Sequence, residues 1–125
     1  MDVKHKIQFG SDPDGLAEKV AAGGKTATSS LYDFYRMNIK EMTKVGEYAS
    51  VTGADGTEKC IVRIERTEVM RFGDITESFA IEEGDGSLEN WLEIHTEYYS
   101  SLLERMGRKL TDETELLCEW FKVVM

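Results

Sequence analysis

The sequence has little of several residue types, and each shortage narrows the classes of protein to consider. Its 125 residues include one proline, Pro13, and two cysteines, Cys60 and Cys118. Because no low-complexity segment or repeat is present either, we expect a single domain over residues 1–125. Neither cysteine has a CxxC or Cys/His partner at zinc-ligand spacing, so we expect no metal and no cofactor.

Long apolar runs are also missing. No stretch of about 18 apolar residues exists, so the sequence predicts no transmembrane helix. The first seven residues hold no apolar run of the kind found in signal peptides. We therefore expect a cytoplasmic protein with no membrane partner. Two buried free thiols suit a reducing compartment, and a single disulfide is the alternative.

Basic residues are outnumbered. Fifteen Lys and Arg against 24 Asp and Glu give a formal net charge of −9. Residues 1–62 carry 8 basic and 9 acidic groups, whereas residues 63–125 carry 7 and 15. Such a chain lacks the whole-surface attraction for phosphates that typical nucleic-acid binders have, so we expect no broad duplex binding. Any polyanion would therefore have to bind mainly to residues 1–62.

The patterning predicts both helices and strands, and 41% apolar residues are enough for a core. Asp12 and Pro13 start a helix that Gly23-Gly24 can end, and Ser87 caps a longer helix that runs to Gly107. Strands are expected over residues 25–31, 48–52, 60–69 and 116–124, and a short helix is a candidate over residues 75–81. Residues 32–42 fit either a helical turn or a loop, and the N-terminus, including His5, is expected to fray. This order favours an α+β fold, a small, mostly antiparallel β-barrel with packed helices, over a parallel α/β sheet.

A stretch of glycine, lysine and threonine over residues 23–28 is a candidate binding site for a phosphate or a carbonyl oxygen. It is not a P-loop, because Lys19 stands where the first glycine would be and the helix precedes the strand. Gly23 and Gly24 allow close approach to the backbone, and Lys25 adds a positive charge. The alternative is a helix C-cap followed by an ordinary polar strand.

Two further segments carry candidate side chains. In the turn Glu82-Glu83-Gly84-Asp85-Gly86, a carboxylate could do acid/base work or hold a lysine's charge, and the alternative is a solvated acidic turn. Trp91 and His95 are four residues apart and share a helix face. They could stack on a base or transfer a proton, and the alternative is a satisfied core histidine.

Taken together, these segments resemble the ASCH domain, in its bacterial single-domain branch. The resemblance rests on Phe9-Gly10, residues 23–31, Val45-Gly46-Glu47-Tyr48, Arg71-Phe72-Gly73-Asp74-Ile75, residues 79–91 and His95. It covers about Phe9 to Val124. It implies a PUA-like β-barrel with helices packed on it and a cleft for RNA or a nucleotide.

The resemblance also implies roles for particular residues. Small N(4)-acetylcytidine amidohydrolases of this kind use Lys-Thr-x-Thr and a glutamate. Matched to that pattern, Thr28 would be the nucleophile, Lys25 its base, and Glu83 the group that sets the lysine's protonation. From the local chemistry described above, we expect Gly23, Gly24, Thr26, Trp91 and His95 to line the ligand site. Other relatives have been linked to RNA cleavage.

One departure from the broad family pattern Gly-x-Lys-x-x-Glu-x-Arg bears on activity. Gly23 and Lys25 match, but Thr28 stands for the glutamate and Ser30 for the arginine. The threonine agrees with the amidohydrolase version, whereas serine cannot replace an arginine's charge.

Three hypotheses follow. The first is an RNA- or nucleotide-binding domain with a cleft around Lys25. The second is a small hydrolase that uses Thr28, Lys25 and Glu83 on a modified nucleoside or on RNA. The third is a scaffold whose aromatic residues, such as Tyr32, Phe34 and Tyr35, contact another protein.

Overall fold

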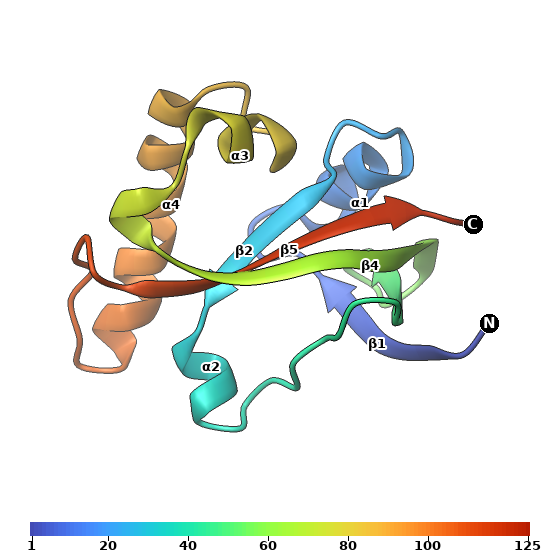
Figure 1. The fold of residues 1–125 in the computed structure, drawn as a ribbon, viewed down its shortest axis with the longest axis horizontal. Helices are drawn as coiled ribbons and strands as arrows, with labels where there is room; N and C mark the ends of the chain where they lie inside the picture. The colour runs from blue at the N-terminus through green and yellow to red at the C-terminus, as the bar shows by residue number, and fades with distance from the viewer.

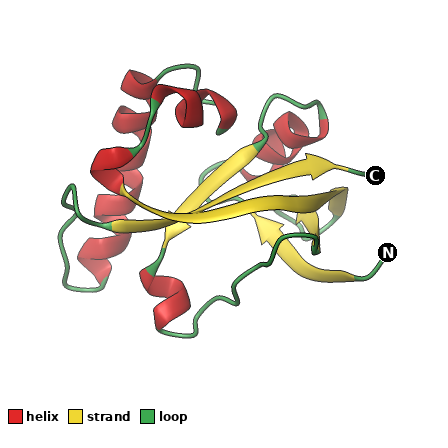
Figure 2. Ribbon diagram, viewed as in Figure 1, coloured by secondary structure: helices red, strands yellow, loops and turns green.

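The computed structural model describes all residues, 1–125, as one mixed sheet with helices packed on it (Figure 1). The strands are β1 (Val3–Gln8), β2 (Ala27–Leu31), β3 (Tyr48–Thr52), β4 (Glu58–Arg71) and β5 (Glu115–Val123). The helices are α1 (Pro13–Ala21), α2 (Asp33–Arg36), α3 (Glu77–Glu82) and α4 (Leu88–Arg105), with a 3₁₀ turn over Phe72–Asp74. Figure 2 shows how loops connect them around the twisted sheet.

The sheet has the order β1-β3-β4-β5-β2. Only β1 and β3 pair in parallel; the other neighbours are antiparallel, so the expected α+β, mostly antiparallel architecture is confirmed. The expected barrel is wrong, because β1 and β2 are the two free edges and do not pair with each other. Closure needs every strand to have two neighbours, and the alternation pattern along single strands contains no information on that.

The predicted helix boundaries agree closely with the structure. The side chain of Asp12 accepts a hydrogen bond from Gly15 N at 3.2 Å, and Pro13 opens α1. Gly23, with φ of +84°, takes the left-handed conformation just beyond α1. The side chain of Ser87 accepts from Asn90 N at 3.1 Å and caps α4.

Two parts of the chain differ from expectation. The N-terminus does not fray: β1 pairs with β3, and His5 Nε2 donates a hydrogen bond to Glu47 Oε1 at 2.9 Å. The segment that forms β1 has few apolar residues, so its alternation of apolar and polar residues was too weak to predict a strand. The ambiguous residues 32–42 form the short helix α2 and then a loop.

The core lies in two parts on opposite faces of the sheet. In the first, α3 and α4 pack on β2 and the start of β5, around Phe79, Trp91 and Tyr99. In the second, α1 packs on β3 and β4. Cys60 and Cys118 are buried free thiols, one in each part. Because residues alternate along β5, Leu116 and Cys118 face the first part and Phe121 the second.

Candidate functional site

The local backbone at the end of α3 delivers Glu83 to the edge strand β2. Thr76 caps α3 by accepting from Phe79 N at 3.1 Å. After Glu83 the chain turns at Gly84, whose φ is +96°. A Cβ on Gly84 would lie 3.1 Å from Lys19 Cδ, so glycine suits this position for both conformation and space. Lys19 donates to Gly84 O at 2.7 Å and fastens the turn to α1.

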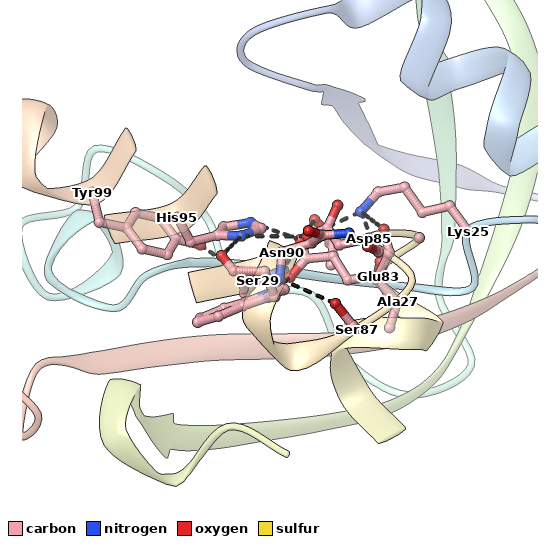
Figure 3. A network of polar contacts seen from close by, with 12 residues as sticks. Lys25, Ala27, Ser29, Glu83, Asp85, Ser87, Asn90, His95 and Tyr99 are labelled. Carbon is pink, nitrogen blue, oxygen red and sulfur yellow. Dashed lines mark hydrogen bonds and ion pairs between the residues drawn. The ribbon is translucent and has the colours of Figure 1, made fainter. Parts of the chain in front are cut away.

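The carboxylate of Glu83 is the centre of a buried polar network (Figure 3). Oε1 accepts from Trp91 Nε1 at 2.7 Å and from Ser29 Oγ at 2.8 Å. Oε2 accepts from Ser29 N at 3.1 Å, Lys25 Nζ at 3.3 Å and Thr28 Oγ1 at 3.5 Å. Glu83 is only 5% exposed. The alternative of a solvated acidic turn therefore does not describe Glu83.

This network keeps Glu83 ionised. Burial by itself raises the pKa of Glu83, but the hydrogen bond from His95 and the charge of Lys25 lower it more, with a net pKa of about 2. His95 Nε2 lies 3.5 Å from Glu83 Oε2. The site thus holds a permanent negative charge that is fully surrounded by donors.

Lys25 is buried beside that charge and has its donors engaged. Nζ donates to Ala27 O at 2.9 Å and to Glu83 O at 3.0 Å, in addition to the Glu83 carboxylate. It also lies 5.0 Å from the centre of the Phe9 ring. Burial lowers the pKa of Lys25, and Glu83 partly offsets this effect. With three acceptors for three N–H groups, the ammonium is satisfied within the protein.

Trp91 and His95 form the stacked pair that their spacing suggests. Their ring centres are 4.3 Å apart with an angle of 16° between the planes. Trp91 is fully buried against Phe72, whereas His95 lines the pocket described below. His95 Nδ1 lies 3.0 Å from Trp91 O and 3.4 Å from Asp85 Oδ2. The stacked pair thus lies against the Glu83 carboxylate, and of its two rings only that of His95 lines the pocket.

A pocket of about 1010 Å³ opens beside this network. Its walls come from residues 4–12, from β2, from the segment 34–43, from α4 and from β5. Lys25, Thr28, Glu83 and His95 all line it. The volume is at the upper end of the usual range for ligand pockets, roughly 300–1,000 Å³.

The other predicted ligand residues lie elsewhere. Gly23, Gly24 and Thr26 are exposed and do not line the large pocket. Gly23 and Thr26 line a separate hollow of about 280 Å³ against the end of β5. The main-chain N–H of Thr26 donates to Glu82 O at 2.8 Å, which joins β2 to the end of α3. The glycines end α1, which agrees with the alternative interpretation of this segment as a helix C-cap.

Ser30 stands where the broad family pattern has arginine. Its Oγ lies 2.8 Å from the hydroxyl of Tyr35, so the two form a neutral pair on the pocket wall. No arginine lines the pocket. The cations on its rim are instead exposed lysines: Lys4, Lys6 and Lys40.

Several site residues were not singled out from the sequence. Ser29 contributes both its N–H and its hydroxyl to Glu83, and its Oγ lies 2.6 Å from Tyr99 OH. Glu119 lines the pocket from β5 and is 5% exposed. A charged residue in the otherwise apolar run 116–124 was the available signal for Glu119.

The sequence and the fold match known proteins. A family model for the ASCH domain matches residues 5–125. The chain belongs to the ASCH domain family. ASCH domains are in general RNA-binding domains with a PUA-like fold. No match exists among curated proteins.

Solved structures agree with this assignment. An ASCH domain from Lactobacillus crispatus JV V101 is 30% identical with a TM-score of 0.87, over 95% of this chain and 78% of that one. Protein EF3133 from Enterococcus faecalis V583 is 29% identical with a TM-score of 0.88, over 99% and 78% of the two chains. The hypothetical protein PH0355, at 19% identity and a TM-score of 0.63, shares the fold, over 99% of this chain and 100% of that one.

Two structural absences complete the description of this ASCH domain. No group of three or more His, Cys, Asp or Glu side chains is arranged to hold a metal ion. None of the helices has both the length and the apolar character needed to cross a bilayer.

Proposed function

We propose that this ASCH domain binds single-stranded RNA or a nucleotide in the large pocket. The observation that carries the proposal is that one pocket collects buried polar side chains from distant parts of an RNA-binding family fold. They come from the segment just before β2 (Lys25), from β2 (Thr28), from the residue that follows α3 (Glu83) and from α4 (His95). Convergent polar groups in a large hollow are the usual mark of a ligand site.

Aromatic rings on the pocket wall support a ligand with flat bases. Phe9, Phe34, Tyr35 and Tyr98 line the pocket from three different segments. Stacking of a base on an aromatic ring contributes about 1–3 kcal/mol and tolerates any sequence. A single strand can present its bases to such rings, whereas a duplex hides them.

The phosphates would be met at the rim rather than by Lys25. The three N–H groups of Lys25 already have acceptors inside the protein. Lys6 and Lys40 are exposed on the rim, with Lys40 Nζ 5.4 Å from the centre of the Phe34 ring, and both can contact an RNA backbone. Acidic residues such as Glu41 and Glu97 line the same rim, so few phosphates can be held. These features support a short, pocket-centred contact.

The experiment is fluorescence anisotropy with a labelled pentanucleotide RNA of mixed sequence. Ser101 is an exposed α4 residue on the pocket wall, and Ser101→Trp would fill the opening. Ser78 is exposed on α3 away from the pocket, so Ser78→Trp is the matched control. We expect at least a tenfold loss of affinity in the first variant only. Equal affinity in both variants would place the RNA outside the pocket.

A hydrolase is the second candidate, and one observation favours it. Thr28 Oγ1 and Lys25 Nζ both contact Glu83 Oε2, and all three residues line the pocket. In this candidate, the Thr28 oxygen attacks an amide carbonyl, and its proton passes to a neutral Lys25. That proton then goes to the departing amine, and water later releases the acyl group from Thr28. Burial lowers the pKa of Lys25 and so favours the neutral form that the step requires.

Incubation with N(4)-acetylcytidine, and separately with single-stranded RNA, tests this candidate. Turnover should be lost in Thr28→Val and retained in Thr28→Ser, which keeps a hydroxyl. Product release that is unchanged in Thr28→Val would exclude Thr28 as the nucleophile. If neither substrate is turned over while RNA binding is intact, binding is the only function of the pocket that the experiment supports.

A further inference from the structure

A second buried carboxylate, Glu119, faces the same pocket and has no role in the network around Glu83. Glu119 on β5 lies directly across from Thr28 on β2 in the antiparallel register. Directly opposed residues point to the same face of the sheet. The two carboxylates therefore approach Thr28 from different sides, Glu83 from the strand edge and Glu119 from within the sheet.

Glu119 is incompletely satisfied. Its Oε2 accepts from Thr43 Oγ1 at 2.5 Å, and Thr43 is itself 8% exposed. Its Oε1 accepts no hydrogen bond from the protein, and although Glu119 as a whole is only 5% exposed, this oxygen is not enclosed and is open to the pocket. No lysine or arginine forms an ion pair with it. Water can donate to this oxygen in the free protein, and a ligand that displaces the water must supply a donor of its own.

The surroundings of Glu119 restrict what that donor can be. Tyr35 and Ser30 lie on the same pocket wall and bond to each other, and neither hydroxyl is hydrogen-bonded to Glu119. The Phe34 and Tyr35 rings line the same pocket and offer flat surfaces, with Lys40 Nζ 5.4 Å from the centre of the Phe34 ring. A flat group with an N–H at its edge satisfies both features, because it can stack while it donates to Oε1.

We infer that Glu119 is a specificity-determining residue that accepts a hydrogen bond from the exocyclic amine of a nucleobase. The inference rests on the proposed RNA- or nucleotide-binding function. Cytosine and adenine carry such an amine, whereas uracil presents a carbonyl oxygen at the corresponding position. A carboxylate accepts from an amine and repels a carbonyl. The pocket therefore favours amino-bearing bases over uracil.

The test compares pentanucleotides of cytidine, adenosine and uridine by fluorescence anisotropy. A good base contact is worth about 1–3 kcal/mol, which corresponds to a preference of roughly 5- to 150-fold over uridine. In Glu119→Gln that preference should fall at least fivefold, because an amide can donate to the uracil carbonyl. Glu41→Gln removes the same charge from the exposed rim of the same pocket, so its preference should match the wild type.

A probe-side change tests the inference on the unaltered protein, in case Glu119→Gln fails to fold. Cytidines whose exocyclic amine carries two methyl groups have no donor there, and they should bind the wild type no better than uridine. Equal binding of all three wild-type probes, or an unchanged preference in folded Glu119→Gln, would overturn the role of Glu119 alone. Failure of the wild type to bind any probe would overturn the binding function as well.

Discussion

The ammonium of Lys25 and the carboxylate of Glu83 form a buried ion pair that joins the start of β2 to the end of α3, with Nζ 3.3 Å from Oε2. Both side chains are at most 5% exposed, so neither charge is solvated by bulk water. The pair is thus a structural element of the pocket wall, whatever ligand the pocket takes.

Removing one member of this pair should destabilise the domain strongly. Glu83→Gln leaves the Lys25 ammonium buried without its counter-charge, which costs about 3–5 kcal/mol of unfolding free energy. The measurement is urea unfolding followed by circular dichroism. Glu82→Gln changes the preceding, less buried carboxylate and should cost about 0.5 kcal/mol or less. Replacing both members together, Lys25→Met with Glu83→Gln, should recover part of the loss. No recovery would mean that the hydrogen bonds, not the charges, dominate.

Acid should weaken the fold through Glu83. Its pKa is lowered from 4.5 to about 2 in the folded state, so the unfolded chain takes up this proton at higher pH. The stabilisation is therefore complete above about pH 4.5 and is lost as the pH falls towards 2. The measurement is unfolding free energy against pH for the wild type and Glu83→Gln. Their difference should shrink across this window, and a constant difference would contradict the lowered pKa.

Trp91 should matter through its indole N–H as well as through its bulk. Trp91→Phe keeps an aromatic ring but removes the 2.7 Å hydrogen bond to Glu83 Oε1, which should cost about 1–3 kcal/mol. Trp120→Phe is a matched control, because Trp120 packs against Phe79 and the Arg66 guanidinium without a hydrogen bond from its indole. Denaturant midpoints that drop equally for both variants would show that bulk alone decides.

RNA binding should depend only weakly on salt. If Lys6 and Lys40 are the two cations that meet phosphates, the slope of log K against log salt should be about −1.4 for a single strand. Lys6→Ala and Lys40→Ala should each reduce the slope by about 0.7. Lys109 is exposed in the α4–β5 connection, away from the pocket, so Lys109→Ala should leave it unchanged. A slope several times steeper would indicate a broad basic contact that the acidic surface does not provide.

Much of the architecture could be predicted from local signals. Asp12, Pro13 and Ser87 are strong helix-start residues, and they begin helices in the structure. The alternation in β4 also predicted a strand. The missing information was non-local: β1 exists because β3 accepts it in parallel, and the sheet stays open because its edges do not meet. Neither property is encoded in the spacing of residues along one segment.

The functional site could be predicted from the sequence only in part. Lys25, Thr28 and Glu83 came from the motif resemblance, and the structure brings them into contact. Ser29 and Glu119 carried no motif, since their importance depends on which side chains face them across the fold. The placement of Lys25 also differs from a simple anion cradle, because its donors are occupied by the protein itself.

Backbone amide shifts in a ¹H–¹⁵N NMR titration with a mixed-sequence pentanucleotide test the central claim most directly. Binding in the large pocket predicts concentration-dependent shifts that cluster at Ser29, Ser30, Tyr35, His95 and Glu119. The β3–β4 turn over residues 53–57 should stay unchanged. Shifts confined to that turn, or none at saturating RNA, would contradict the account.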